Sequence, residues 1–101
     1  MYEIDFNKIN KRPELRIGDK IYQVDNRLST FEKMNRELAD KGKNGSDFEI
    51  VVKTALGEDA FAEILAMDMG YGAAHQLVIT ILAAIQDMEV EAAQSRFRHG
   101  A

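Results

Sequence analysis

Residues 46–70, with the sequence SDFEIVVKTALGEDAFAEILAMDMG, carry the clearest helical pattern of the chain. Apolar residues recur in it every three or four positions, the spacing that places them on one face of an α-helix. Ser46 and Glu49 have the spacing of a capping box, in which each side chain accepts a hydrogen bond from a backbone N–H at the helix start. Gly57 and then Gly70 provide two helix ends. The stretch therefore predicts two consecutive short helices.

Each of these helices has an apolar stripe that is expected to face the core. The stripes are Phe48, Val51, Val52, Ala55 and Leu56 in the first helix, and Phe61, Ile64, Leu65 and Met69 in the second. Glu58 and Asp59 open the second helix, where negative charge meets the positive end of the helix dipole.

On the C-terminal side, Gly70-Tyr71-Gly72 forms a turn before a long helix that is expected over residues 73–97. Its apolar stripe is Leu77, Ile81, Ala84, Ile85, Met88 and Ala92, widened by Val78 and Leu82. At about 1.5 Å per residue this helix is roughly 35 Å long, more than a small core requires. Its polar end is expected to project and meet another chain.

On the N-terminal side, Ser29 and Glu32 form a second predicted capping box. The helix that it begins has the stripe Leu28, Phe31, Met34 and Leu38, and Gly42 provides its stop. Residues 2–6 alternate apolar and polar residues, which predicts a short strand.

Gly18-Asp19 separates residues 14–17 from residues 20–24, and this dipeptide suits the turn of a β-hairpin. One face of the hairpin is expected to carry Leu15, Ile17, Tyr22 and Val24. An isolated hairpin is marginally stable in water, so this face must pack on helices.

We therefore predict a mainly α fold of the α+β type, in which short N-terminal strands precede about four helices, the last one long. A length of 101 residues indicates one domain, residues 1–101. Within it we expect a β element over residues 1–27, a helical array over residues 28–97 and a frayed tail over residues 98–101.

Composition excludes several classes of protein. The chain has no cysteine, which removes disulfides, thiolate catalysis and cysteine-based zinc sites. We expect neither a secretory signal nor a membrane span, and hence a soluble protein. The net charge is −4, and it is concentrated in residues 58–101, which hold seven acidic and two basic residues. This acidic half disfavours nucleic-acid binding and suits a basic protein partner.

Catalytic and metal-binding patterns are weak. The two histidines, His75 and His99, lack the His-Glu-x-x-His spacing of a zinc site. The acidic sets Glu58/Asp59/Glu63 and Asp87/Glu89/Glu91 have the pattern of solvated helix faces. Gly70-Tyr71-Gly72 lacks the rest of a phosphate-binding loop. We predict a non-enzymatic protein without cofactor, metal or small-molecule substrate.

A protein-binding surface is the remaining prediction. For self-association or partner contact we select Leu77, Ile81, Ile85 and Met88 of the long helix. The same four positions equally fit an ordinary core. Methionine is over-used on surfaces that accept varied helices, so exposure of Met67 or Met88 beside the long helix would indicate a helix-binding groove.

The chain resembles the tail assembly chaperones of long-tailed phages and prophages of Gram-positive bacteria. The resemblance lies in the β segment that ends in Ile21-Tyr22-Gln23-Val24, the charged helix over residues 31–41, and Ala55-Leu56-Gly57-Glu58-Asp59-Ala60-Phe61. A terminal helix with an acidic end and Arg96-Phe97 completes it. It covers most of the chain as a pattern of size and element order.

This resemblance implies a chaperone that coats the tape measure protein and recruits tail tube subunits in the cytoplasm of a bacterial host. It also implies a homo-oligomer, and that this chain is the short form of a pair of proteins made by ribosomal frameshifting. Two alternatives remain open. One is a minor structural phage component, such as a head–tail connector or tail subunit. The other is a DNA-binding regulator, although residues 73–79 contain no Arg or Lys to read DNA.

Overall fold

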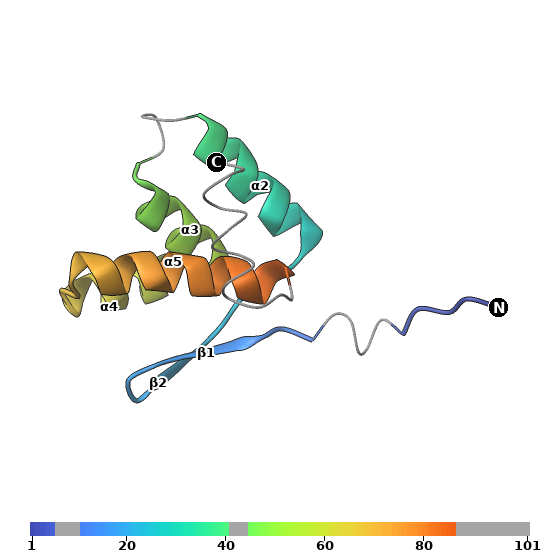
Figure 1. Cartoon of the computed structure of the whole chain (residues 1–101), viewed down its shortest axis with the longest axis horizontal. Helices are drawn as coiled ribbons and strands as arrows, with labels where there is room; N and C mark the ends of the chain where they lie inside the picture. The colour runs from blue at the N-terminus through green and yellow to red at the C-terminus, as the bar shows by residue number, and fades with distance from the viewer. Residues whose placement is uncertain (6–10, 41–44, 87–101) are drawn as a thin grey trace.

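The computed structural model describes residues 1–5, 11–40 and 45–86 of the chain. It confirms the predicted order over these residues, a β-hairpin followed by four helices (Figure 1). The strands are β1 (Glu14–Ile17) and β2 (Lys20–Gln23). The helices are α2 (Leu28–Ala39), α3 (Asp47–Leu56), α4 (Glu58–Ala66) and α5 (Tyr71–Gln86).

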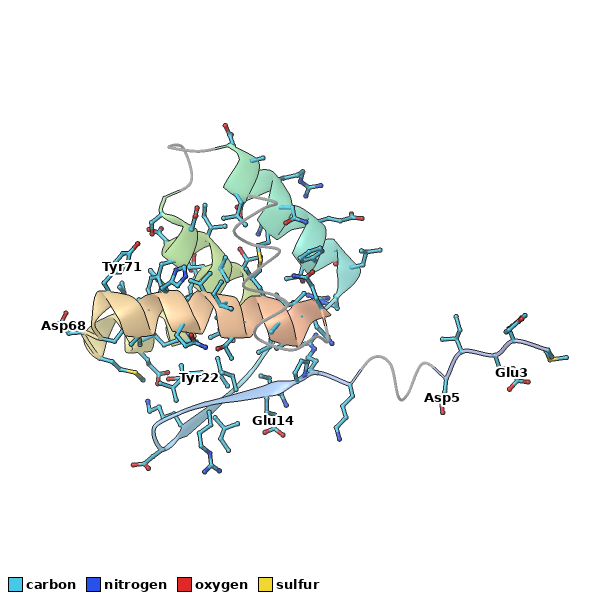
Figure 2. The ribbon with its side chains drawn as sticks, in the orientation of Figure 1. Glu3, Asp5, Glu14, Tyr22, Asp68 and Tyr71 are labelled. Carbon is cyan, nitrogen blue, oxygen red and sulfur yellow. The ribbon has the colours of Figure 1, made fainter. Side chains whose placement is uncertain are left out.

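The hairpin has the predicted turn and the predicted buried face. Ile17 lies opposite Lys20 across the Gly18-Asp19 turn, and Gly18 has a φ of 61°, which glycine adopts without steric cost. The inward face consists of Leu15, Ile17, Tyr22 and Val24, all packed against or within the core. Figure 2 shows Tyr22 on the side of the hairpin that faces the helices and Glu14 on the other side.

Helix α3 is the centre of the helical array, because it packs against α2, α4 and α5. Its Val51 and Val52 have no exposed surface, and Met34 of α2 is equally buried. One cluster of buried side chains extends from Val24, after the hairpin, to Leu82 of α5. The hairpin lies on one side of α5, and α2 and α3 lie on the other (Figure 1).

Backbone hydrogen bonds tie the exit of the hairpin to α3. The N–H of Val24 donates to the carbonyl of Pro13 at 2.8 Å, which extends the strand ladder by one pair. The N–H of Asp25 then donates to the carbonyl of Ala55 at 2.9 Å. The first residues of α2 are therefore held beside the last turn of α3.

The predicted start of α2 is wrong. The N-cap is Arg27, which makes no side-chain cap hydrogen bond, and Ser29 and Glu32 lie inside the helix. Leu28, expected to face the core, is 72% exposed. The predicted stop at Gly42 lies outside the described residues, and α2 ends at Ala39.

The predicted end of α4 is also wrong. The helix ends at Ala66, before Gly70, and Asp68 has a φ of 48° in the left-handed region. Leu65, expected to face inward, is 54% exposed because the buried face of α4 is centred on Phe61 and Ile64.

The two ends of the chain differ from expectation in different ways. Residues 1–5 form no strand and are exposed, which contradicts the strand predicted over residues 2–6, although Phe6 lies outside the described residues. Helix α5 begins at Tyr71, two residues earlier than predicted. Its described part has 16 residues and is roughly 24 Å long. The predicted continuation to residue 97 lies outside the described residues.

Candidate functional site

An apolar groove runs between β1 and the first half of α5, with a cavity volume of about 410 Å³. We call it the Met67 groove. It is lined by Leu15, Arg16, Ile17, Met67, Met69, Ala73, Gln76, Leu77 and Thr80. The lining comes from three places that are distant in the sequence, namely β1, the α4–α5 connection and α5.

The early end of α4 creates one wall of this groove. Because the chain turns at Asp68, Met67 and Met69 lie in the connection between α4 and α5 and not on a helix face. Met67 is 39% exposed, whereas Met69 is partly buried against the core. Methionine side chains are flexible and polarizable, so this wall can adapt to apolar groups of different shape.

The groove is less polar than its residue types imply. The hydroxyl of Thr80 donates to the carbonyl of Gln76 at 2.8 Å, so this donor is already used within α5. The other polar residues of the lining are Gln76 and Arg16, both exposed, and Arg16 is the one charged residue. The groove therefore suits an apolar ligand with a negative group at its rim.

The other edge of the hairpin is attached to α4. Glu63 forms an ion pair with Lys20 of β2 and accepts a hydrogen bond from the Tyr22 hydroxyl at 3.4 Å. The hydrogen bond from Lys20 lowers the pKa of Glu63, and Glu63 in turn raises the pKa of Lys20. The groove is lined by β1 residues and by none from β2, so it lies on the β1 side of the hairpin.

Two other hollows lie elsewhere on the described part of the molecule. One, of about 440 Å³, lies between the starts of α3 and α5 and includes Tyr71 and His75. Its Ser46 hydroxyl is occupied as the cap of α3, where it accepts from the Glu49 N–H at 3.2 Å.

The second hollow, of about 280 Å³, is charged and lies between α2 and α3. Three of its charged residues, Glu37, Glu49 and Lys53, have polar partners within the hollow. Lys53 lies 2.9 Å from Glu49 and over the ring of Phe61, and the hydroxyl of Thr54 donates to Glu37 at 3.3 Å. The hydrogen bond with Glu49 raises the pKa of Lys53.

The four selected residues of the long helix have different positions. Leu77 and Ile81 both belong to the buried core, with 7% and no exposed surface, and Leu77 also borders the groove. Ile85 is partly buried against the core. Met88 lies outside the described residues. Ordinary core packing, the alternative left open for these positions, thus describes Leu77 and Ile81 in this fold.

From the sequence, Met67 was expected to line a groove only if it proved exposed. No sequence pattern predicted that β1 also lines this groove. Met67 is exposed beside α5, as a helix-binding groove requires. The contribution of Leu15 and Ile17 was missed because a core-facing strand position and a groove-lining position have the same alternating pattern.

The residues considered for chemistry are scattered. Within the described part of the chain, no three His, Asp or Glu side chains gather as a metal site would require. His99 and the set Asp87/Glu89/Glu91 lie outside it. In the same part of the chain, no helix combines the length and the apolar character needed to cross a membrane.

Comparison with known proteins finds no matching family, curated relative or solved structure.

Proposed function

We propose that this chain is a non-enzymatic protein-binding domain that holds an apolar segment of a partner protein in the Met67 groove. The observation that supports this most is a 39% exposed Met67 on the wall of an apolar groove of about 410 Å³. Exposed apolar surface of this kind is typical of interaction sites.

The partner that we propose is the tape measure protein of a long-tailed phage or prophage, with the chain acting in the host cytoplasm as a tail assembly chaperone that also recruits tail tube subunits. This assignment rests on the resemblance in size and element order. A long helical partner carries apolar stripes that aggregate when unshielded, and an apolar groove on an acidic protein can cover them reversibly.

Binding energetics favour many weak contacts over one strong contact. Burying one large apolar side chain contributes about 1.5–3 kcal/mol, while association costs at least about 4 kcal/mol. One groove therefore binds weakly, and several copies along one partner gain affinity through multivalency. A chaperone that must later be released benefits from contacts of this kind.

Co-expression with the tape measure protein of the same phage genome tests the proposal. We expect the partner to be soluble, and to elute together with this chain, only when the chain is present. Met67→Lys should abolish this effect, because it places a charge in the groove without disturbing the core. Leu65→Lys is the matched control, since Leu65 is 54% exposed and does not line the groove.

Equal loss of partner solubility with both variants would argue against the groove as the binding site. If the partner stays insoluble with the wild-type chain, and the chain is found in purified virions, the function is that of a structural phage component.

A further inference from the structure

The outer edge of β1 is built to accept another strand. In an antiparallel pair, the residues next to a two-residue turn exchange hydrogen bonds, and such pairs then alternate along the ladder. Ile17–Lys20 and Leu15–Tyr22 are therefore the hydrogen-bonded pairs of the hairpin. It follows that the backbone N–H and C=O groups of Glu14 and Arg16 point away from β2, toward the open edge.

This open edge is also the rim of the Met67 groove. Arg16 lines the groove although it is not on the inward face of the hairpin. A residue of the outward face can line the groove because β1 is an edge strand. An occupant that satisfies both features must be extended, with apolar side chains at alternate positions. One set of side chains would enter the groove while the backbone pairs with β1.

The N-terminal segment of the chain (residues 1–5) has this character. Tyr2 and Ile4 are 105% and 67% exposed, and Glu3 lies between them. The segment lies away from the hairpin and helices of its own copy (Figure 1). Figure 2 shows Glu3 and Asp5 on the same side of this extended segment.

We propose that residues 1–5 of one copy add as a third strand to β1 of a second copy, with Tyr2 and Ile4 in the Met67 groove. In this arrangement Glu3 lies opposite Arg16, on the solvent face of the hairpin. That pairing holds for a parallel and for an antiparallel strand, because Tyr2 and Ile4 flank Glu3 in either direction. Opposite charges on directly opposed residues stabilise a sheet.

The inference deepens the proposed function and rests on it in one respect, namely that the partner uses the same groove. The segment of a second copy then occupies the groove until the partner displaces it. Self-association would protect the apolar groove and set a threshold for partner binding.

A disulfide trap tests the arrangement, and the absence of cysteine from the chain makes it unambiguous. Glu3→Cys and Arg16→Cys are made in separate chains, which are mixed and oxidised. Directly opposed strand residues have the spacing that a disulfide needs, so we expect a covalent heterodimer on a non-reducing gel. Leu28→Cys, at a 72% exposed position on α2, replaces Arg16→Cys as the matched control and should give at least tenfold less of it.

Equal yields with Arg16→Cys and Leu28→Cys would overturn the proposal. An intramolecular disulfide in the doubly substituted chain, without covalent dimer, would also overturn it, because the segment would then occupy the groove of its own copy.

A second measurement uses Tyr2→Ser with Ile4→Ser, which leaves the core untouched because both side chains are exposed. Sedimentation should show self-association weakened at least tenfold, and the partner should bind more tightly to this variant. If the disulfide does not form but Met67→Lys still abolishes partner solubility, the inference fails and the proposed function stands. If the disulfide forms but the wild-type chain leaves the partner insoluble, the proposed function fails and the strand exchange stands.

Discussion

Asp25 links the end of the hairpin to the start of α2 and to the last turn of α3. Its carboxylate accepts from the Arg27 guanidinium at 2.9 and 2.8 Å and from the Arg27 backbone N–H at 3.2 Å. Its own N–H donates to Ala55 at the end of α3. The hydrogen bonds from Arg27, with a further one from Thr30, hold the pKa of this carboxyl well below its usual range. Asp25 thus supplies the negative charge that the start of α2 lacks in its own first turn.

Replacing Asp25 by Asn should lower the free energy of unfolding at neutral pH by roughly 1–2 kcal/mol, because hydrogen bonds to a charged group are lost. The folded-state pKa lies below the unfolded value of about 3.9, so the stabilisation is complete above that pH and is lost as the pH falls through and below it. Urea denaturation should therefore show the difference between wild type and Asp25→Asn shrinking from about pH 6 to about pH 3.

The control for this experiment is Asp19→Asn in the exposed hairpin turn, which removes one negative charge without touching a helix. Its effect should remain within about 0.5 kcal/mol. A pH-independent difference for Asp25→Asn would show that the carboxylate acts by packing and not by its charge.

At the scale of the elements, the two Ser-x-x-Glu patterns have different outcomes. Ser46 caps α3, with its hydroxyl accepting from the Glu49 N–H, whereas Ser29 lies inside α2 and is exposed. The difference arises because the hydrogen bond of Asp25 to Ala55 fixes the chain just before α2, so that the helix begins one residue before Ser29.

This difference predicts opposite sensitivity to the same substitution. Ser46→Ala should lower the free energy of unfolding by about 1 kcal/mol, because an N-cap acceptor is lost. Ser29→Ala should be neutral or stabilising by up to about 0.5 kcal/mol, since alanine is the better helix former in a helix interior. Urea denaturation followed by circular dichroism measures both, and equal losses would mean that Ser29 also acts as a cap.

At the scale of the whole molecule, the core crosses every described helix and the exit of the hairpin. Ile81 is fully buried in α5, and Val24 fills the position between hairpin and helices with no exposed surface. Small domains are stable by only about 5–15 kcal/mol, so a single cavity at such a position is a large fraction of the total.

Ile81→Ala should therefore lower the free energy of unfolding by about 2–5 kcal/mol, through lost burial and the cavity left behind. Leu65→Ala, at a 54% exposed position on α4, should change it by less than about 0.5 kcal/mol. Thermal and urea denaturation compare the two variants. A near-neutral Ile81→Ala would contradict the core assignment and return this residue to the predicted interaction surface.

Features that depend on neighbours a few positions apart could be predicted from the amino-acid sequence. The Gly18-Asp19 turn, the Ser46 cap and the Gly57 break between α3 and α4 all follow from local backbone chemistry. The order of hairpin and helices follows from them, as do most of the buried positions, because periodicity identifies one face of each element.

Which ambiguous apolar residues are buried, and where the apolar groove lies, depends on contacts between elements that are distant in the sequence. Leu28 and Leu65 continue apolar stripes but are exposed, because no neighbouring element of the described chain covers them. The Met67 groove lies between β1 and α5, and the distance between these two elements cannot be predicted from a local sequence pattern. Its form depends on how the hairpin is attached to α3 and α4, which is a property of packing across the whole chain.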